Sequence, residues 1–302
     1  MNRIYKYCIV LLAGASLLAC QQPTPKEKLQ AAVMAQIDSV GGEVAVAFLN
    51  LDDRADSLFI NTDSAFHAAS TMKVPVMIEL FRQQREGKIN LNDTIVLVNE
   101  FKSIVDGSPY SMDIADDSDD VIYNKIGTKV TLHELMVPMI TVSSNLATNV
   151  LIELVGAKNV TATMRGLGAA HIQVLRGVED QKAYDLGLSN STTARDLLVI
   201  LEAIANNRAG APGDCAAMVD ILEGQQFNEI IPFYLPKEVR VAHKTGVITA
   251  LHHDAGIVYL PDGRSYVLVL LSKNLKDFDA GTQQLARISK IFYDYMMGEG
   301  RQ

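Results

Sequence analysis

Ser70-Thr71-Met72-Lys73 places a hydroxyl and an amine three residues apart, in a segment that we predict to be helical over about residues 71–86. Side chains three apart on a helix share a face, so the Ser70 hydroxyl and the Lys73 amine can approach within hydrogen-bond reach. A serine hydroxyl is a weak nucleophile unless an adjacent base takes its proton. The pair therefore predicts a serine nucleophile with a lysine base. Taken alone, it also fits an ordinary helix start with a solvated lysine.

Two later tripeptides extend this pattern, Ser143-Ser144-Asn145 and Lys244-Thr245-Gly246. Separately, the first fits a cap at the start of a helix and the second fits the end of a strand. Together with the first motif, they give S-x-x-K, S-x-N and K-T-G in the order typical of penicillin-recognising serine enzymes. The chain resembles the class A β-lactamases, and the resemblance runs from about residue 27 to the end.

Apolar periodicity predicts strands at both ends of the chain and helices between them. The predicted strands are 43–51, 57–61, 239–245, 255–260 and 266–272. The predicted helices include 26–40, 145–154, 281–297 and 192–205, the last capped by Ser191 or Thr192. The resemblance implies an α/β fold with a mainly antiparallel five-stranded sheet, helices on both sheet faces and an all-helical lobe. We expect the α/β lobe at about 29–68 and 215–302 and the helical lobe at about 69–214, with the catalytic groups between them.

The first residues are predicted to be an export signal. Arg3 and Lys6 precede a mostly apolar run, which ends in Leu17-Leu18-Ala19-Cys20. This ending resembles a bacterial lipobox, so we expect a signal peptide at 1–19, lipidation of Cys20 and a polar tether at 20–28. An ordinary secretory signal or a short membrane anchor is the alternative. The expected location is the cell envelope, with the protein held to a membrane by the lipid.

The cysteine content decides whether disulfides are expected, and the net charge decides which classes of binding partner are expected. Cys215 would be the only cysteine besides Cys20 after cleavage, so no intramolecular disulfide is expected in the mature chain. Loss of Arg3 and Lys6 changes the net charge from −8 to −8 − 2 = −10. Nucleic acid is therefore not an expected partner. An anionic substrate would need a local cationic pocket. We expect a monomer.

The resemblance assigns a role to each motif. Ser70 would attack the lactam carbonyl, Lys73 would help to remove its proton, and Ser143 would relay a proton to the departing nitrogen. Asn145 would hold both Lys73 and the substrate amide. Charge repulsion from Lys244 is expected to lower the pKa of Lys73.

The third motif would bind the substrate. Lys244 and Thr245 would bind its carboxylate, and Gly246 would let it lie close to the edge strand. The backbone N–H groups of Ser70 and Val247 would form the oxyanion hole. No metal and no organic cofactor is expected.

Deacylation separates a β-lactamase from an enzyme that stays acylated. The resemblance assigns the water-activating carboxylate to Glu179, with Arg176 as the anchor of its loop; a solvated surface glutamate is the alternative. Three positions depart from the family pattern. Ala183 replaces an asparagine that shares the water, Ser144 replaces an aspartate, and 252–254 carries His-His-Asp where an arginine often binds the carboxylate.

Two other clusters contain metal-ligating residue types. His252 and His253 are adjacent, and neighbours on a strand point to opposite faces, so no metal site is expected there. The acidic run 116–120 lacks the glycine and terminal glutamate of an EF-hand loop, and we expect it to be a solvated loop.

The sequence therefore predicts a class A β-lactamase-like serine hydrolase that opens the β-lactam amide through an acyl-serine intermediate. Alternatives with the same acylation groups are a peptidoglycan D-Ala peptidase or an esterase. A sensor or other penicillin-binding lipoprotein that stays acylated, or a structural lipoprotein with a decayed site, also remains open. The position of Glu179 relative to Ser70 discriminates between them.

Overall fold

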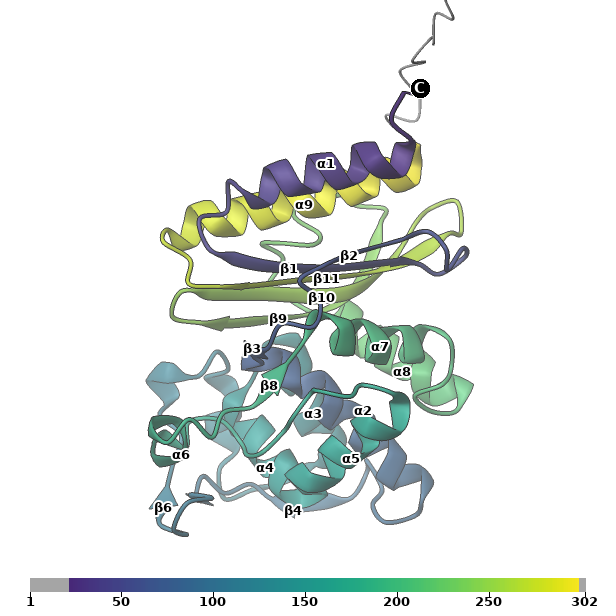
Figure 1. Cartoon of the computed structure of the whole chain (residues 1–302). Coiled ribbons are helices and arrows are strands. Elements are labelled where there is room, and N and C mark those ends of the chain that lie inside the picture. The colour runs from purple at the N-terminus through teal and green to yellow at the C-terminus, as the bar shows by residue number, and fades with distance from the viewer. Residues whose placement is uncertain (1–21, 299–302) are drawn as a thin grey trace, which may run out of the picture.

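The computed structural model describes residues 22–298, and a five-stranded antiparallel sheet forms its upper half (Figure 1). The strands come from both ends of the chain: β1 (Glu43–Asn50), β2 (Ser57–Ile60), β9 (Arg240–Ile248), β10 (Leu251–Tyr259) and β11 (Ser265–Lys273). Their order across the sheet is β2-β1-β11-β10-β9, and every neighbouring pair is antiparallel. The predicted fold class is confirmed, and β9 is an edge strand.

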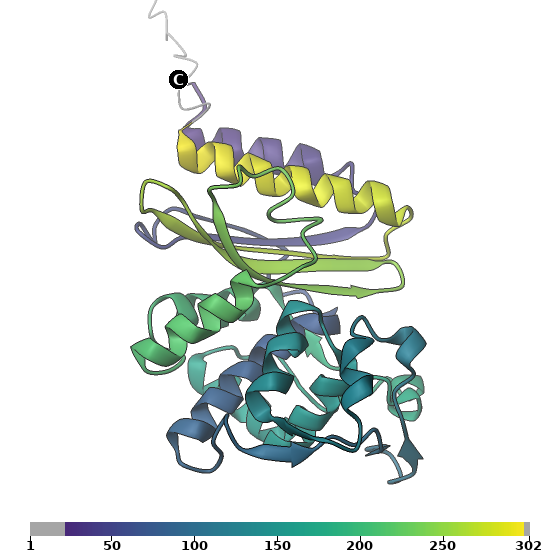
Figure 2. The same ribbon diagram turned by 180° about the vertical axis from the view of Figure 1, so that it is seen from behind.

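Helices cover both faces of the sheet. α1 (Pro25–Ile37) and α9 (Phe278–Met297) lie side by side on one face (Figures 1 and 2). α7 (Ala194–Ala205) packs on the other face against β1, β10 and β11. Strand β1 is therefore buried on both sides. Val46 and Phe48 belong to the core under α1 and α9, whereas Ala47 and Leu49 belong to the core shared with α7.

The lower half of the molecule consists of helices and short strand pairs (Figure 2). Its longer helices are α2 (Lys73–Arg85), α3 (Leu132–Thr141), α4 (Asn145–Val155) and α5 (Ala157–Leu167), and α8 (Pro212–Glu223) packs against α3 and β9. The short helices are α6 (Gln181–Asp185) and the 3-10 turns η1 (Ala69–Met72), η2 (Ile114–Asp116) and η3 (Val121–Lys125). The two-residue and three-residue strands pair as β3 (Phe66–His67) with β8 (Ser191–Thr192), β4 (Thr94–Val96) with β7 (Lys129–Thr131), and β5 (Phe101–Lys102) with β6 (Pro109–Tyr110).

The nucleophile segment differs from the predicted continuous helix. Ser70 lies in the 3-10 turn η1, and the α-helix α2 begins only at Lys73. The turn packs against the edge strand β9. The first S-x-x-K residue therefore faces the sheet, while the lysine starts the helix that enters the lower half.

Two predicted boundaries are wrong for a physical reason. Strand β10 begins at Leu251 and not at residue 255, because the polar residues 252–254 are buried, find partners inside the protein and pair with β9. Helix α7 is capped by Thr193, whose hydroxyl accepts from the Asp196 N–H; the expected caps, Ser191 and Thr192, form strand β8. Because Ser191 and Thr192 pair with strand β3, the helix begins only after both residues.

Cys20 and the predicted signal peptide lie outside the described residues. Among residues 22–298, no helix combines the length and the apolar character needed to span a bilayer.

Candidate active site

Ser70 is half-buried at the junction of the sheet and the lower half. Its 3-10 turn is closed by Thr71, whose N–H and hydroxyl both donate to the Ala68 carbonyl, at 3.1 and 2.6 Å. Ala69 adopts a left-handed backbone conformation, with φ of 44°, and its N–H donates to His67 Nδ1 at 3.0 Å. A non-glycine residue in this region is uncommon and costs energy. Local hydrogen bonds thus hold the nucleophile on a strained turn.

Lys73 is completely buried one turn below Ser70. Its Nζ donates to the Ser143 carbonyl at 2.7 Å, to Ser143 Oγ at 3.1 Å and to Asn145 Oδ1 at 2.9 Å. The structure therefore brings the S-x-x-K lysine together with both polar ends of the S-x-N motif.

Burial lowers the pKa of Lys73 to about 7, while the negative charges of Asp117 and Glu179 partly oppose this shift. The expected direction is thus present, but its main cause is loss of hydration and not repulsion by Lys244. Lys244 is also completely buried; burial first, and then the charge of Lys73, lowers its pKa well below the ordinary value. A lysine whose pKa lies near neutrality is suited to accept a proton.

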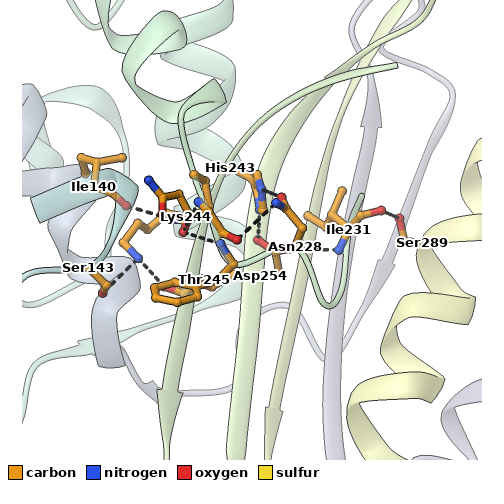
Figure 3. Close-up of polar contacts among 12 residues, drawn as sticks. Ile140, Ser143, Asn228, Ile231, His243, Lys244, Thr245, Asp254 and Ser289 are labelled. Atoms are coloured by element: carbon orange, nitrogen blue, oxygen red, sulfur yellow. Dashed lines mark hydrogen bonds and ion pairs between the residues drawn. The ribbon is translucent and has the colours of Figure 1, made fainter. Parts of the chain in front are cut away.

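Lys244 reaches the same serine from the sheet side. Its Nζ donates to Ser143 Oγ at 3.1 Å and to the Thr245 carbonyl at 3.0 Å (Figure 3). Ser143 is buried and, with φ of 60°, also has a left-handed backbone. Its hydroxyl oxygen thus lies between the two amines, which is a geometry that can pass a proton between them.

Gly246 lies where the edge strand β9 approaches the Ser70 turn. A Cβ built on this residue would lie 3.2 Å from Ser70 N, Ala69 Cβ and Thr71 Cγ2. The missing side chain therefore makes room for the Ser70 turn. Its neighbour Val247, paired with His252, is half exposed at the edge of the sheet. This close approach brings Ser70 N next to the strand that carries Val247 N, as an oxyanion hole requires.

Two hollows meet at Ser70. One, of about 390 Å³, runs toward Glu179 and is lined by His67, Arg176 and Tyr184. The other, of about 610 Å³, runs past Ser143 and Thr245 toward the start of α9. A substrate could therefore extend from the nucleophile in both directions.

Glu179 lines the same hollow as Ser70. Its Oε1 accepts from Asn145 Nδ2 at 2.8 Å, and its backbone is left-handed, with φ of 60°. Partial withdrawal of water by the cleft walls raises its pKa, and the nearby charges of Asp117 and Asp116 add to the increase. The side chain remains accessible from the cleft. A carboxylate that lines the same hollow as the nucleophile can hold a water molecule between them.

The loop that carries Glu179 is tied down at three points. Asn149 Oδ1 accepts from Val178 N at 2.6 Å, and its Nδ2 donates to the Val178 carbonyl at 3.0 Å. The buried Arg176 guanidinium donates to the carbonyls of Gly177 and Leu188, both at 2.9 Å, and so joins the two arms of the loop. The Asp180 carboxylate accepts from Ser103 Oγ at 2.8 Å and from the Ile104 N–H at 2.8 Å. Arg176 thus links the loop through carbonyls.

The structure also places the residues that depart from the family pattern. Ala183 is completely buried in α6, and a methyl group there cannot share a water molecule with Glu179. His252 points toward α9 and bonds Thr282 Oγ1 at 2.8 Å, while His253 Nε2 bonds the His67 carbonyl at 3.0 Å.

Asp254 is also occupied within the protein. It pairs with His243 Nδ1 at 2.8 Å and accepts from the Ile231 N–H at 2.9 Å (Figure 3). Together with His252 and His253, it is therefore committed to internal contacts. No cluster of three metal-ligating side chains exists among residues 22–298.

One residue at the site was missed by the sequence analysis. Asp117 lies in the acidic run that was expected to be only a solvated loop, yet its carboxylate contacts the N-terminus of α4 next to Asn145. One signal for this role was present in the sequence. The S-x-N motif lacks its usual aspartate at Ser144, and the acidic run at 116–120 could supply a carboxylate instead.

Comparisons with known proteins agree with this geometry. The family model described as the β-lactamase enzyme family matches residues 24–296. The extended-spectrum β-lactamase PER-1 of Pseudomonas aeruginosa is 25% identical over 92% of this chain and 89% of its own length. The solved structure of a β-lactamase from Sphaerobacter thermophilus is 28% identical, with a TM-score of 0.74, and covers 89% of this chain and 96% of its own.

A PBP-A variant solved as an acyl-enzyme complex with penicillin G is 25% identical. Its TM-score is 0.74, and the match covers 91% of this chain and 99% of that one. The family model spans nearly all of the described residues. The chain belongs to the β-lactamase enzyme family.

Proposed function

We propose that this protein opens the amide of β-lactams through an acyl-Ser70 intermediate and then hydrolyses that intermediate with Glu179 as the base. The observation that carries the proposal is the position of Ser70 between two separately held groups. Ser143, which bonds both buried amines, lines the second hollow together with Ser70, and the Glu179 carboxylate lines the first hollow together with Ser70.

Acylation would begin with loss of the Ser70 proton to neutral Lys73. A neutral lysine has two N–H bonds and one lone pair. It can therefore bond only two of the three acceptors that surround Lys73 Nζ, and its lone pair is then free to accept a proton. Ser143 Oγ bonds both Lys73 and Lys244, and it can then pass a proton to the lactam nitrogen as the C–N bond breaks. The negative oxygen that forms on the carbonyl would be held by the N–H groups of Ser70 and Val247.

The substrate would be bound mainly from the β9 side. Thr245 and Lys244 would bind its carboxylate, while the half-buried Asn145 would contact its amide as well as Lys73. Residues 252–254 lack the arginine that often assists. Asp254 and His253 are engaged within the protein, and His252, which lines the second hollow, bonds Thr282. We therefore expect weaker carboxylate binding than the complete pattern would give, seen as a raised KM.

Deacylation would use a water molecule between Glu179 and the ester. The raised pKa of Glu179 makes it a better proton acceptor than an ordinary carboxylate. Because Ala183 offers no second partner for that water, turnover is expected to be slower than acylation.

The test is to mix the protein with a chromogenic cephalosporin and to follow colour and intact mass together, with Ser70→Ala as the control. We expect a mass increase of one opened lactam, followed by hydrolysis. The variant should show neither while keeping its thermal unfolding temperature. Labelling of Ser70→Ala would contradict the assignment of the nucleophile.

A second candidate function rests on the missing water partner at Ala183. Without it, the same acylation groups could serve a D-Ala peptidase, an esterase or a protein that stays acylated. A mass increase that persists for hours with penicillin, together with release of D-Ala from a peptidoglycan peptide, would favour the peptidase.

We also propose that the protein is an exported lipoprotein attached to a membrane through Cys20. The Leu17-Leu18-Ala19-Cys20 ending supports this proposal. Cells fed labelled palmitate should incorporate it into the protein but not into Cys20→Ser. Equal incorporation by the two forms would contradict lipidation at this position.

A further inference from the structure

Helix α4 begins at the S-x-N motif and therefore presents its first N–H groups beside the active site. The four leading N–H groups of a helix have no partner within it. Ser144, the N-cap residue, accepts from the Ala147 N–H through its hydroxyl at 3.3 Å. The N–H groups of Asn145 and Leu146 need acceptors from elsewhere, and Ser144 has only one side-chain oxygen to offer.

Asp117 supplies these acceptors from a separate loop. The Asn145 N–H lies 2.9 Å from Asp117 Oδ1 and 3.0 Å from Oδ2, and the Leu146 N–H donates to Oδ2 at 2.9 Å. Tyr123 donates its hydroxyl to Oδ2 at 3.0 Å and so fixes the carboxylate from its other side. Bonds from N–H groups to a carboxylate are charge-assisted and are stronger than bonds between neutral groups.

Asn145 is the residue through which this contact reaches the chemistry. Its Oδ1 accepts from Lys73 Nζ at 2.9 Å, and its Nδ2 donates to Glu179 Oε1 at 2.8 Å. One amide thus bridges the proposed base for acylation and the proposed base for deacylation. The Asn145 backbone that carries this amide is held by Asp117.

We propose that Asp117 is a positioning residue that holds Asn145 in its bridge between Lys73 and Glu179, in place of the aspartate that the S-x-N motif lacks at Ser144. This inference rests on the proposed function. It adds that one acidic residue of the 116–120 loop sets the geometry of both steps. The other acidic residues of that loop do not contact α4 through any hydrogen bond recorded in residues 22–298.

Several charged groups surround the Asn145 bridge. Lys73 faces Asp117 and Glu179 as well as the buried Lys244, and Glu179 faces Asp117 and Asp116. Burial and the Asp117 charge raise the pKa of Tyr123, which therefore remains a hydrogen-bond donor. Removal of the Asp117 charge should lower the pKa of Lys73, so that its neutral form persists to lower pH.

The test is a double-mutant cycle on acylation of Ser70, with Asp117→Asn, Asn145→Ala and the double variant. Acylation is followed by intact mass with penicillin G and, in parallel, with a fluorophosphonate probe that reports serine reactivity whatever the natural substrate. Asp120→Asn is the matched control, because it removes the same charge from an exposed residue of the same loop. Thermal unfolding of every variant shows which fraction is folded.

Asp117→Asn should slow acylation between about 10- and 100-fold, as expected for a displaced catalytic group. The double variant should be no slower than Asn145→Ala alone, because the lost contact acts through Asn145. The acidic limb of the acylation profile should also move to lower pH, which a loss of stability alone would not cause. Asp120→Asn should stay within about twofold of the unmodified protein, as a surface substitution.

Additive effects of the two substitutions, or an unmoved acidic limb, would overturn the positioning role. Failure of penicillin to label the unmodified protein would refute the β-lactam function, while the fluorophosphonate cycle would still decide the role of Asp117. Failure of both probes would refute both proposals.

Discussion

The two sides of Ser70 are built differently. The groups proposed for acylation, which we call the attack side, are Lys73, Ser143 and Lys244. They are buried and belong to regular elements or their immediate ends. On the water side, Glu179 sits on a loop, accessible from the cleft, and is held indirectly by Asn149 and the Arg176 contacts. Groups on packed elements keep a fixed geometry, whereas loops vary more readily. Under the proposed function, the groups for acylation would therefore be held more rigidly than the base for deacylation.

The largest expected effect comes from removing the water-side carboxylate. Glu179→Ala should still be acylated by penicillin G, because attack by Ser70 uses Lys73. Deacylation should fall by roughly 10²–10⁴-fold, which is the usual contribution of a general base. Intact mass over time measures both steps. Equal deacylation rates with and without Glu179 would move the peptidase and sensor alternatives ahead and would remove the contrast between the two sides.

The contribution of the attack side should be visible in the pH dependence of the acylation rate. With the pKa of Lys73 at about 7, its neutral form falls tenfold for each pH unit below that value. Acylation of the unmodified protein should therefore be about 100-fold slower at pH 5 than on the plateau above pH 8. Burst kinetics between pH 5 and 9 measure this step alone. A flat profile would contradict proton transfer to Lys73.

A smaller effect is expected where the strand meets the nucleophile turn. Gly246→Ala places a methyl group 3.2 Å from Ser70 N, so the turn or the strand must shift by a few tenths of an ångström. Because the oxyanion hole serves both steps, acylation and deacylation should slow together, by about 10- to 100-fold. The control is Gly166→Ala, where the added methyl group meets open space. Slowing of only one step would show that Gly246 does not set the hole.

The smallest effect should come from loosening the loop. Asn149→Ala leaves the Val178 N–H without its partner and leaves the Val178 carbonyl with only the Tyr110 hydroxyl, at a cost of about 1–3 kcal/mol in the free energy of unfolding. Deacylation should slow by up to about tenfold while acylation stays within about twofold. Single-turnover rates and melting temperature measure the two effects. Asn159→Ala, which removes a bond to the Val155 carbonyl away from the loop, is the control. An equal loss in both steps would mean that Asn149 supports the attack side as well.

Sequence reasoning worked best where a short spacing carries the chemistry. The three motifs indicated the family, and the apolar residues of 43–51 indicated a strand, which β1 confirms, although β1 is buried on both faces. It failed where a polar segment is buried. The predicted strand began only at residue 255, yet His252, His253 and Asp254 belong to strand β10, where each has a partner inside the protein.

The sequence by itself determined the order and chemical type of the groups around Ser70, because the residues of each motif are neighbours or lie three apart in the chain. Only the tertiary structure decided that burial, and not Lys244, lowers the pKa of Lys73. It also decided that Gly246 makes room for the Ser70 turn and that Asp117 reaches α4. These features depend on hydration and on contacts between residues distant in the chain, and no local pattern records either of them.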